Sequence, residues 1–140
     1  MKNTIGGEFV ADLVLAGEAL QNACHGLAKE SGWWTDLVSG TALTTDKTAA
    51  PLVNIPEKLM LCVSELAEAM EGHRKNLMDD KLPHRKMLEV ELADTVIRCF
   101  DLAGGIGLDL GGAIVEKLQF NASRADHKIE NRLAENGKKF

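Results

Sequence analysis

Hydrophobic residues recur at intervals of three and four over most of the chain, which is the spacing of one face of an α-helix. No stretch alternates apolar and polar residues as a half-buried strand would. We therefore expect an all-α fold, built as a four-helix core in a single domain over residues 1–140. The four helices are expected over residues 7–31, from near Pro56, over residues 87–102, and from Asp109 or Leu110 along apolar positions that run to Leu133.

Two of these helices carry pairs of carboxylates three residues apart. In the first, Glu65 and Glu68 share one face beside a stripe that we expect to face the core. That stripe consists of Leu59, Cys62, Val63, Leu66 and Met70. The second helix, residues 87–102, is apolar nearly all round, which is typical of a buried helix.

A narrow polar stripe interrupts this second helix at spacings of three, four and three. It consists of Glu91, Asp94, Arg98 and Asp101. Buried carboxylates cost several kcal/mol each unless they are paired or bind metal. Because a short connection makes the two helices antiparallel neighbours, we expect Glu65, Glu68, Glu91 and Asp94 to converge. Four carboxylates without His or Cys suit Mg²⁺ or Mn²⁺; a structural ion network around Arg98 is the alternative.

Composition narrows the classes of function. The chain has 140 residues, is 45% hydrophobic and carries a formal net charge of -5. The negative charge argues against binding to polymeric nucleic acid. No apolar run approaches a membrane span, and Glu8 and Asp12 interrupt the N-terminal apolar pattern, which argues against a signal peptide. Three widely spaced cysteines, which we expect to be small buried residues, are typical of a reducing cytoplasm.

Several other residues are candidates for ligand contacts. His25 lies near the end of the first helix, and two adjacent tryptophans follow it in a chain with only 4% aromatic residues. One of Trp33 and Trp34 can pack in the core while the other lines a cleft and stacks on a base. The stretch 36–56 has no clear periodicity and is long enough to be a binding loop or a disordered segment. We expect the tail, residues 135–140, to fray.

A basic stripe lies on the last helix at steps of four, three and four. It consists of Lys117, Asn121, Arg124 and Lys128. By itself such a stripe is typical of a solvated face. Beside an acidic metal site it would suit a phosphate clamp.

Taken together, these residues resemble the MazG-like all-α nucleoside triphosphate pyrophosphohydrolases, a group related to the dimeric dUTPases. The family motif is Glu-Glu-x-x-Glu, a spacer, and Glu-x-x-Asp. It is matched here by residues 64–68, a 22-residue spacer and residues 91–94, except that Ser64 replaces the first Glu. The segment from Glu116 to Arg124 resembles the family's Lys/Asn/Arg substrate-binding segment, and residues 54–60 resemble its entry to the metal helix. The resemblance covers about residues 20–128.

The resemblance implies hydrolysis of an NTP or dNTP to the monophosphate and pyrophosphate, with deoxynucleotides favoured. Glu65, Glu68, Glu91 and Asp94 would hold Mg²⁺, and Glu65 or Glu68 would act as the general base. Lys117, Asn121 and Arg124 would bind the substrate. Family members form homodimers or homotetramers, and a role in control of the nucleotide pool would follow.

Two other functions stay open from the sequence. One is a non-enzymatic, oligomeric helical module for binding or regulation, in which the acidic seam is structural. The other is a ferritin-like di-iron protein, which requires Glu-x-x-His pairs. No His stands three residues after any of the four carboxylates, so this alternative ranks last.

Overall fold

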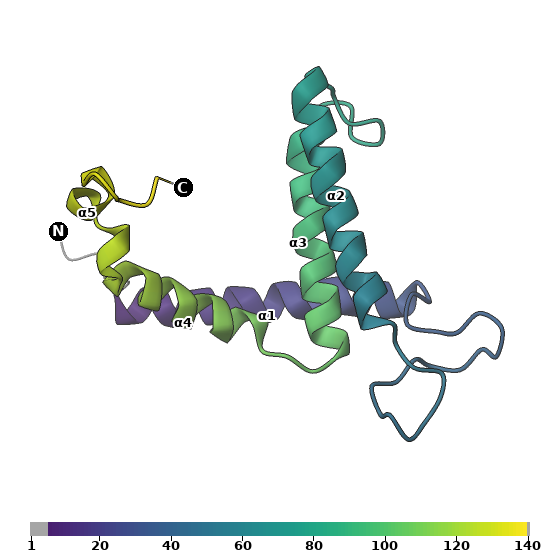
Figure 1. Cartoon of the computed structure of the whole chain (residues 1–140). Helices are drawn as coiled ribbons and strands as arrows, with labels where there is room; N and C mark the ends of the chain where they lie inside the picture. The colour runs from purple at the N-terminus through teal and green to yellow at the C-terminus, as the bar shows by residue number, and fades with distance from the viewer. Residues whose placement is uncertain (1–5, 140) are drawn as a thin grey trace. The chain divides into compact units, whose positions relative to one another are not determined.

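The computed structural model describes residues 6–139 and confirms the all-α prediction (Figure 1). Within that part of the chain the only extended pairings are isolated bridges, at Thr35 with Ala42, Thr44 with Leu52, and Met78 with Lys86. The helices are α1 (Gly7–Glu30), α2 (Ile55–Lys75), α3 (Met87–Gly105), α4 (Leu110–Ser123), the 3₁₀ turn η1 (Ala125–His127) and α5 (Ile129–Leu133). None of the described helices is both long and apolar enough to cross a membrane.

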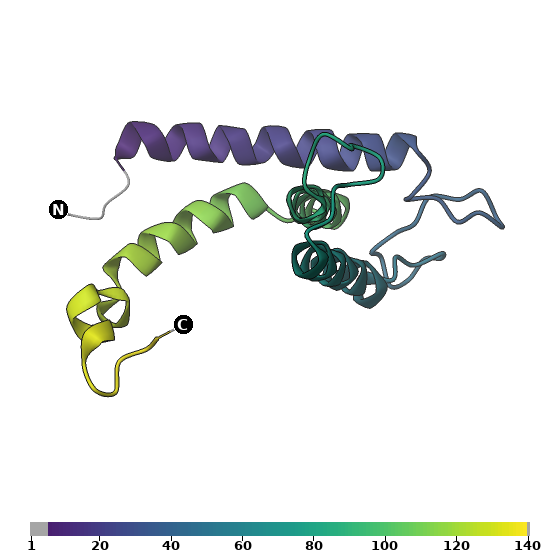
Figure 2. The same ribbon diagram turned by 90° about the horizontal axis from the view of Figure 1, so that it is seen from above.

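The described chain divides into two compact units. One contains residues 20–108, and the other contains residues 6–19 and 109–139. The first unit holds the α2–α3 hairpin, whose helices run side by side, as the two views in Figures 1 and 2 agree. This hairpin carries both carboxylate pairs.

Local sequence signals fix both ends of α2. The side chain of Asn54 accepts a hydrogen bond from the backbone N–H of Glu57 at 3.2 Å, and Pro56 occupies the first turn, where its missing N–H costs nothing. Asn76 ends the helix in the left-handed conformation, with φ of 52°. The helix start predicted near Pro56 is therefore confirmed.

The packing face of α2 differs from the predicted one. Its buried residues are Cys62, Glu65, Ala69 and Gly72. Gly72 brings the backbone close to α3, because a Cβ there would lie 2.8 Å from the Cγ of Met87. The predicted core stripe is correct only at Cys62, and four of its members are exposed: Leu59, Val63, Leu66 and Met70. Small residues allow the close approach, so Glu65 lies inside the hairpin rather than at its edge.

The expected all-round burial of α3 is also wrong for the single chain. Phe100, Leu102 and Ala103 are buried, whereas Leu92, Val96 and Ile97 are exposed. Cys99 is exposed as well, although its thiol lies 3.8 Å from the thiol of buried Cys62. Apolar surface therefore flanks the carboxylates on both helices.

Trp34 anchors the end of α3 to the segment that follows α1. Its side chain is buried at 6% exposure, and its ring fills the space where Gly105 has no side chain. Gly104 approaches His25 of α1 in the same way, with 2.6 Å from a hypothetical Cβ to the His25 Cβ. Gly104 and Gly105, the last two residues of α3, therefore permit this packing because they have no side chains.

Residues 36–54 form no helix, but hydrogen bonds hold their backbone in place. The backbone N–H of Asp36 donates to the carbonyl oxygen of Thr41 at 2.8 Å, and Val53 N–H donates to Thr44 at 2.9 Å. The long loop predicted there is confirmed up to Asn54, where α2 is capped. Its backbone forms a chain of tight turns.

In the second unit, α4 packs against the first part of α1 through glycine. A Cβ on Gly17 would lie 2.6 Å from the Cα of Gly111. The single long last helix that we expected is wrong, because α4 ends at Ser123 and the chain continues as η1 and α5. The tail is hydrogen-bonded up to Lys139 through Arg132, and Phe140 lies outside the described residues.

The close contact between Gly105 and Trp34 yields a stability prediction. Gly105→Ala should lower the free energy of unfolding by about 1–3 kcal/mol, because the added methyl group must displace the Trp34 ring. Gly26→Ala is the matched control: nothing lies within 4 Å of its Cβ position, so better helix propensity should raise stability by up to about 1 kcal/mol. Urea unfolding of both variants measures the two changes; equal effects would contradict this packing.

Candidate metal centre

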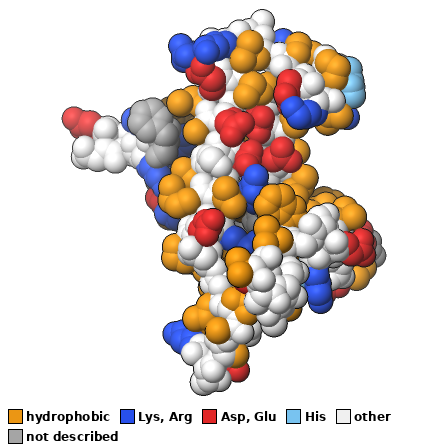
Figure 3. Space-filling view, turned by 90° about the vertical axis from the view of Figure 1, so that its right-hand side faces the viewer, with side chains coloured by type: hydrophobic (Ala, Val, Ile, Leu, Met, Phe, Trp, Pro, Cys, Tyr) orange, Lys and Arg blue, Asp and Glu red, His pale blue; other side chains and the backbone are white. Residues whose placement is uncertain are grey.

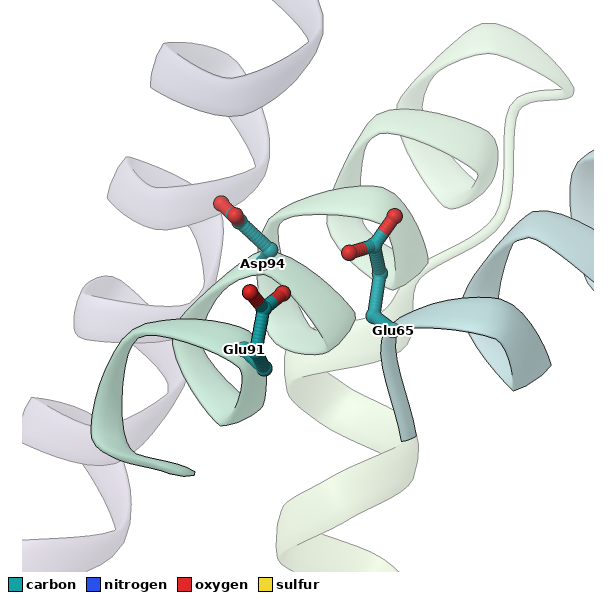
Figure 4. A group of neighbouring side chains, drawn as sticks. All are labelled: Glu65, Glu91 and Asp94. Carbon is teal, nitrogen blue, oxygen red and sulfur yellow. The ribbon is translucent and has the colours of Figure 1, made fainter. Parts of the chain in front are cut away.

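Three of the four predicted carboxylates come together between α2 and α3. Glu65, Glu91 and Asp94 each offer an oxygen atom, and these oxygens lie within 4.8 Å of one another. Figure 4 shows the three carboxylates side by side, Glu65 from α2 and the other two from successive turns of α3. Glu65 and Glu91 are buried and Asp94 is half-buried. The convergence expected from the motif spacing is therefore present for these three.

The donor set fits a hard divalent cation. It contains only carboxylate oxygens, which Mg²⁺ prefers, and it has no thiolate or imidazole that would favour zinc or copper. Half-burial of Asp94 leaves one side open, as a cation that retains water or binds phosphate requires. The residues present therefore fit Mg²⁺ or Mn²⁺.

Burial and the charges of neighbouring acids both disfavour the ionised forms of Glu91 and Asp94. Burial, a hydrogen bond shared with Glu65, and the charges of Glu68, Glu65 and Asp94 raise the pKa of Glu91 to about 7. Burial and the charge of Glu65 also raise the pKa of Asp94, and the positive charge of Arg98 opposes this rise only in part. Near pH 7 Glu91 is therefore protonated in part of the molecules, and a bound cation would displace that proton.

Arg98 pairs with the trio through Glu65. Its Nε donates to Glu65 Oε1 at 2.6 Å. Asp79, in the connection between the helices, is buried and accepts the backbone N–H groups of Lys81 and Leu82, and its charge adds to the rise in the pKa of Asp94. Asp79 is therefore a further acid near the trio, and helical spacing does not identify it because it lies in the connection.

Glu68, the fourth predicted ligand, lies outside this trio. Its side chain is exposed, although its charge contributes to the raised pKa of Glu91. Ser64 stands where the family motif has its first Glu, and its hydroxyl donates to the carbonyl oxygen of Leu61 at 2.8 Å. Glu68 is therefore the carboxylate of the motif that faces solvent.

A second polar cluster, centred on Asp101, lies further along the same hairpin. Asp101 Oδ1 accepts a hydrogen bond from Trp34 Nε1 at 2.6 Å and lies 3.0 Å from His25 Nδ1. Asp101 Oδ2 lies 3.4 Å from Lys58 Nζ, which also sits 4.2 Å from the centroid of the Trp34 ring. The predicted ligand residues His25 and Trp34 are thus joined through a carboxylate whose partners the sequence did not identify.

The two adjacent tryptophans divide as expected. Trp34 is buried, and Trp33 is 72% exposed. One therefore packs in the core and the other presents an indole face to solvent.

Lys58 of the Asp101 cluster was not among the predicted site residues. The signal that could have identified Lys58 is its position two helical turns before Glu65 on the same face of α2.

The predicted basic stripe belongs to the other unit and is only partly helical. Lys117 and Asn121 lie on α4, but the helix ends before Arg124, so the spacing that placed Arg124 and Lys128 on one helical face is wrong. Arg124 instead forms two hydrogen bonds with Asp126, at 2.9 and 2.5 Å. The Oδ1 atom of Asn121 is buried and accepts no hydrogen bond from the residues that the structure describes.

Comparison with known proteins adds no relative: no family model, curated protein or solved structure matches this chain.

The raised pKa of Glu91 predicts a pH dependence of stability in the absence of divalent cations. The folded state holds the proton of Glu91 more tightly than the unfolded state, so the stabilisation is complete below about pH 4.5 and is lost as pH rises through about 7. The free energy of unfolding should therefore fall between pH 5 and pH 8, by up to about 3 kcal/mol from this group. Denaturant titrations in the presence of a chelator measure it.

Glu91→Gln is the control for this effect, because the amide does not titrate, and its stability should change much less over the same interval. Addition of Mg²⁺ should remove the fall in the wild type, and calorimetry near pH 6.5 should show proton release on binding that vanishes by pH 8.5. The same pH dependence in Glu91→Gln and wild type would contradict the assignment.

Proposed function

We propose that this chain is a Mg²⁺-dependent pyrophosphohydrolase that converts a nucleoside triphosphate, with deoxynucleotides favoured, to the monophosphate and pyrophosphate. The observation that supports it is the convergence of Glu65, Glu91 and Asp94 within 4.8 Å. These are the motif positions that carry the resemblance to the MazG-like family. Control of the cellular nucleotide pool is the role that such an activity would serve.

In this proposal Glu65, Glu91 and Asp94 hold Mg²⁺, with Mn²⁺ as a possible substitute, and Glu68 adds a further oxygen from the solvent side. When bound there, the cation would neutralise charge on the phosphates and lower the pKa of a water that attacks phosphorus. The chain's overall charge of -5 gives it no general attraction for a triphosphate. A divalent cation in the acidic pocket would offset most of the negative charge there and give the phosphates a positive centre to bind.

The reaction needs a base as well as a cation. Water adds to phosphorus, the anhydride bond between the α- and β-phosphates breaks, pyrophosphate leaves, and a proton passes to the base. Glu68 suits this step better than Glu65, because Glu65 is buried and already paired with Arg98. Glu68 is exposed beside the trio, and its charge acts on Glu91.

The substrate would be held by groups outside the carboxylates. Lys117 and Arg124 would contact phosphate oxygens, and Arg124 would exchange Asp126 for phosphate. The buried Oδ1 of Asn121 needs a hydrogen-bond donor, and a sugar hydroxyl is one. Trp33, which is exposed, would offer the indole face on which the base stacks, and the buried Trp34 and His25 would support this end of the site through Asp101.

We propose that the active form is a homodimer or homotetramer. Exposed apolar side chains flank the acidic group, and Figure 3 shows acidic side chains surrounded by hydrophobic ones on one face. On α2 and α3 these residues are Leu59, Met60, Val63, Leu66, Met70, Leu92, Val96 and Ile97. Large exposed apolar side chains gathered on one pair of helices are typical of an interaction surface. A second copy would cover it and exclude water from the carboxylates.

The decisive experiment is a panel of the eight common NTPs and dNTPs, with pyrophosphate and orthophosphate measured separately. The proposal expects pyrophosphate and the monophosphate, formed only when Mg²⁺ or Mn²⁺ is present. Release of orthophosphate alone would assign a different bond cleavage. No release from any nucleotide would favour the alternative, a non-enzymatic helical module whose acidic seam is structural.

Removal of single carboxylates should abolish nearly all activity without unfolding the protein. We expect Glu68→Gln and Asp94→Asn each to lower turnover by roughly 100-fold or more, because the cation supplies several kcal/mol of charge stabilisation. Loss of a like charge should leave the melting temperature of the metal-free protein unchanged or higher.

Glu71→Gln is the matched control for these carboxylate variants. Glu71 is also on α2, but it pairs with Arg74 and Lys75 on the exposed face, so this variant should keep wild-type turnover. Near-wild-type turnover of Asp94→Asn at saturating Mg²⁺ would remove the metal centre from the proposal.

The basic residues should affect substrate use far more than stability. Lys117→Ala and Arg124→Ala should each lower kcat/KM by roughly 10- to 100-fold, since a charge-assisted hydrogen bond contributes about 1.5–3 kcal/mol. Asn121→Ala should have a smaller effect. Lys75→Ala, which removes an exposed ion pair on α2, is the control and should change little. Unchanged kcat/KM in both basic variants would assign these residues to a solvated surface.

A further inference from the structure

Arg98 makes an incomplete ion pair. Its Nε donates to Glu65 Oε1 at 2.6 Å, and neither terminal nitrogen donates to any residue between 6 and 139. The side chain of Glu65 is 8% exposed, whereas that of Arg98 is 41% exposed. The guanidinium group therefore uses its Nε as a hydrogen-bond donor to Glu65, and its two terminal nitrogens keep their donors for another ligand.

Two other arginines in the chain show the complete, two-nitrogen pairing of a guanidinium with a carboxylate. Arg74 binds Glu71 through both Nε, which donates to Oε2 at 2.9 Å, and a terminal nitrogen, which donates to Oε1 at 3.0 Å. Arg124 binds Asp126 through the same two nitrogens. In each case two parallel donors of the fork meet one carboxylate, which is the strongest geometry for that pair. Arg98 does not use it, although its carboxylate partner is buried and close.

The position of Arg98 explains what the free donors could bind. It lies one helical turn after Asp94 on α3, and its partner Glu65 belongs to the carboxylate trio. A planar guanidinium with unused donors matches two oxygens of one phosphate. Lys58, the next cation along α2, is held by Asp101 and the Trp34 ring, so Arg98 is the cation in direct contact with the trio.

We propose that Arg98 is a phosphate-binding residue of the active site, in addition to Lys117 and Arg124. Its Nε stays on Glu65, and its outer nitrogens bind phosphate oxygens of the substrate beside the cation. The inference rests on the proposed function for its choice of ligand. It also gives Arg98 a second effect, because a guanidinium on Glu65 competes with Mg²⁺ for that carboxylate.

These two effects have opposite signs when Arg98 is removed, and calorimetry can measure both without turnover. The probes are Mg²⁺ alone and inorganic pyrophosphate in saturating Mg²⁺. Arg98→Gln should bind Mg²⁺ as tightly as the wild type or more tightly, and should bind pyrophosphate about 10- to 100-fold more weakly. Arg98→Lys, which keeps the charge but loses the fork, should recover only part of the pyrophosphate affinity.

Arg85→Gln is the matched control, because Arg85 forms an exposed ion pair with Glu89 just before α3 and should leave both affinities unchanged. Equal pyrophosphate affinity in Arg98→Gln and wild type would overturn the proposal, as would a wild type that binds Mg²⁺ but no pyrophosphate. A lower melting temperature with unchanged pyrophosphate binding would assign Arg98 a structural role. Because no step requires hydrolysis, failure of the nucleotide panel is distinguishable from failure of this inference.

Discussion

The burial of Glu65, Glu91 and Asp94 against one another is the constraint on which the α2–α3 hairpin depends. Small residues on α2, Ala69 and Gly72, let the helices approach closely enough to bring acids from both into one seam. Removing carboxylates from water and placing them together raises their free energy, and one guanidinium offsets only part of that cost. The remainder is relieved by a proton on Glu91, whose pKa rises to about 7, or by a bound cation.

The charges along the seam are ordered. At one end Lys58 and Asp101 form a pair within a cluster that includes His25 and Trp34. The thiols of Cys62 and Cys99 follow, and burial raises the pKa of Cys62 to about 11, so that this thiol stays neutral. Beyond them lie Arg98 and the carboxylate trio. The negative charge is thus balanced at the Asp101 end and concentrated at the carboxylate trio. If a second copy of the chain covered the exposed apolar side chains beside the trio, the local dielectric constant would fall.

The sequence predicted the elements and the pairing of the carboxylates because both follow from helical spacing. The predicted packing face of α2 is shifted by one residue from the observed face. The prediction followed the large apolar residues, such as Leu66 and Met70, whereas the face that meets α3 contains the small residues Ala69 and Gly72. The prediction also extended α4 too far, because apolar spacing continued through Arg124 while the backbone turned. The hydrogen bonds of Asp101 and the single-donor pairing of Arg98 could not be predicted, as they depend on side-chain geometry between distant residues.

The most direct test of the central claim is a crystal structure of the protein grown with Mn²⁺, with the ion located by anomalous scattering. If the three carboxylates hold a divalent cation, we expect a manganese peak between α2 and α3, at coordination distance from oxygens of Glu65, Glu91 and Asp94, and no such peak in Glu91→Gln crystals under the same conditions. Empty density between these carboxylates at millimolar Mn²⁺, with the ion bound elsewhere or not at all, would contradict it and assign the acidic seam to structure alone.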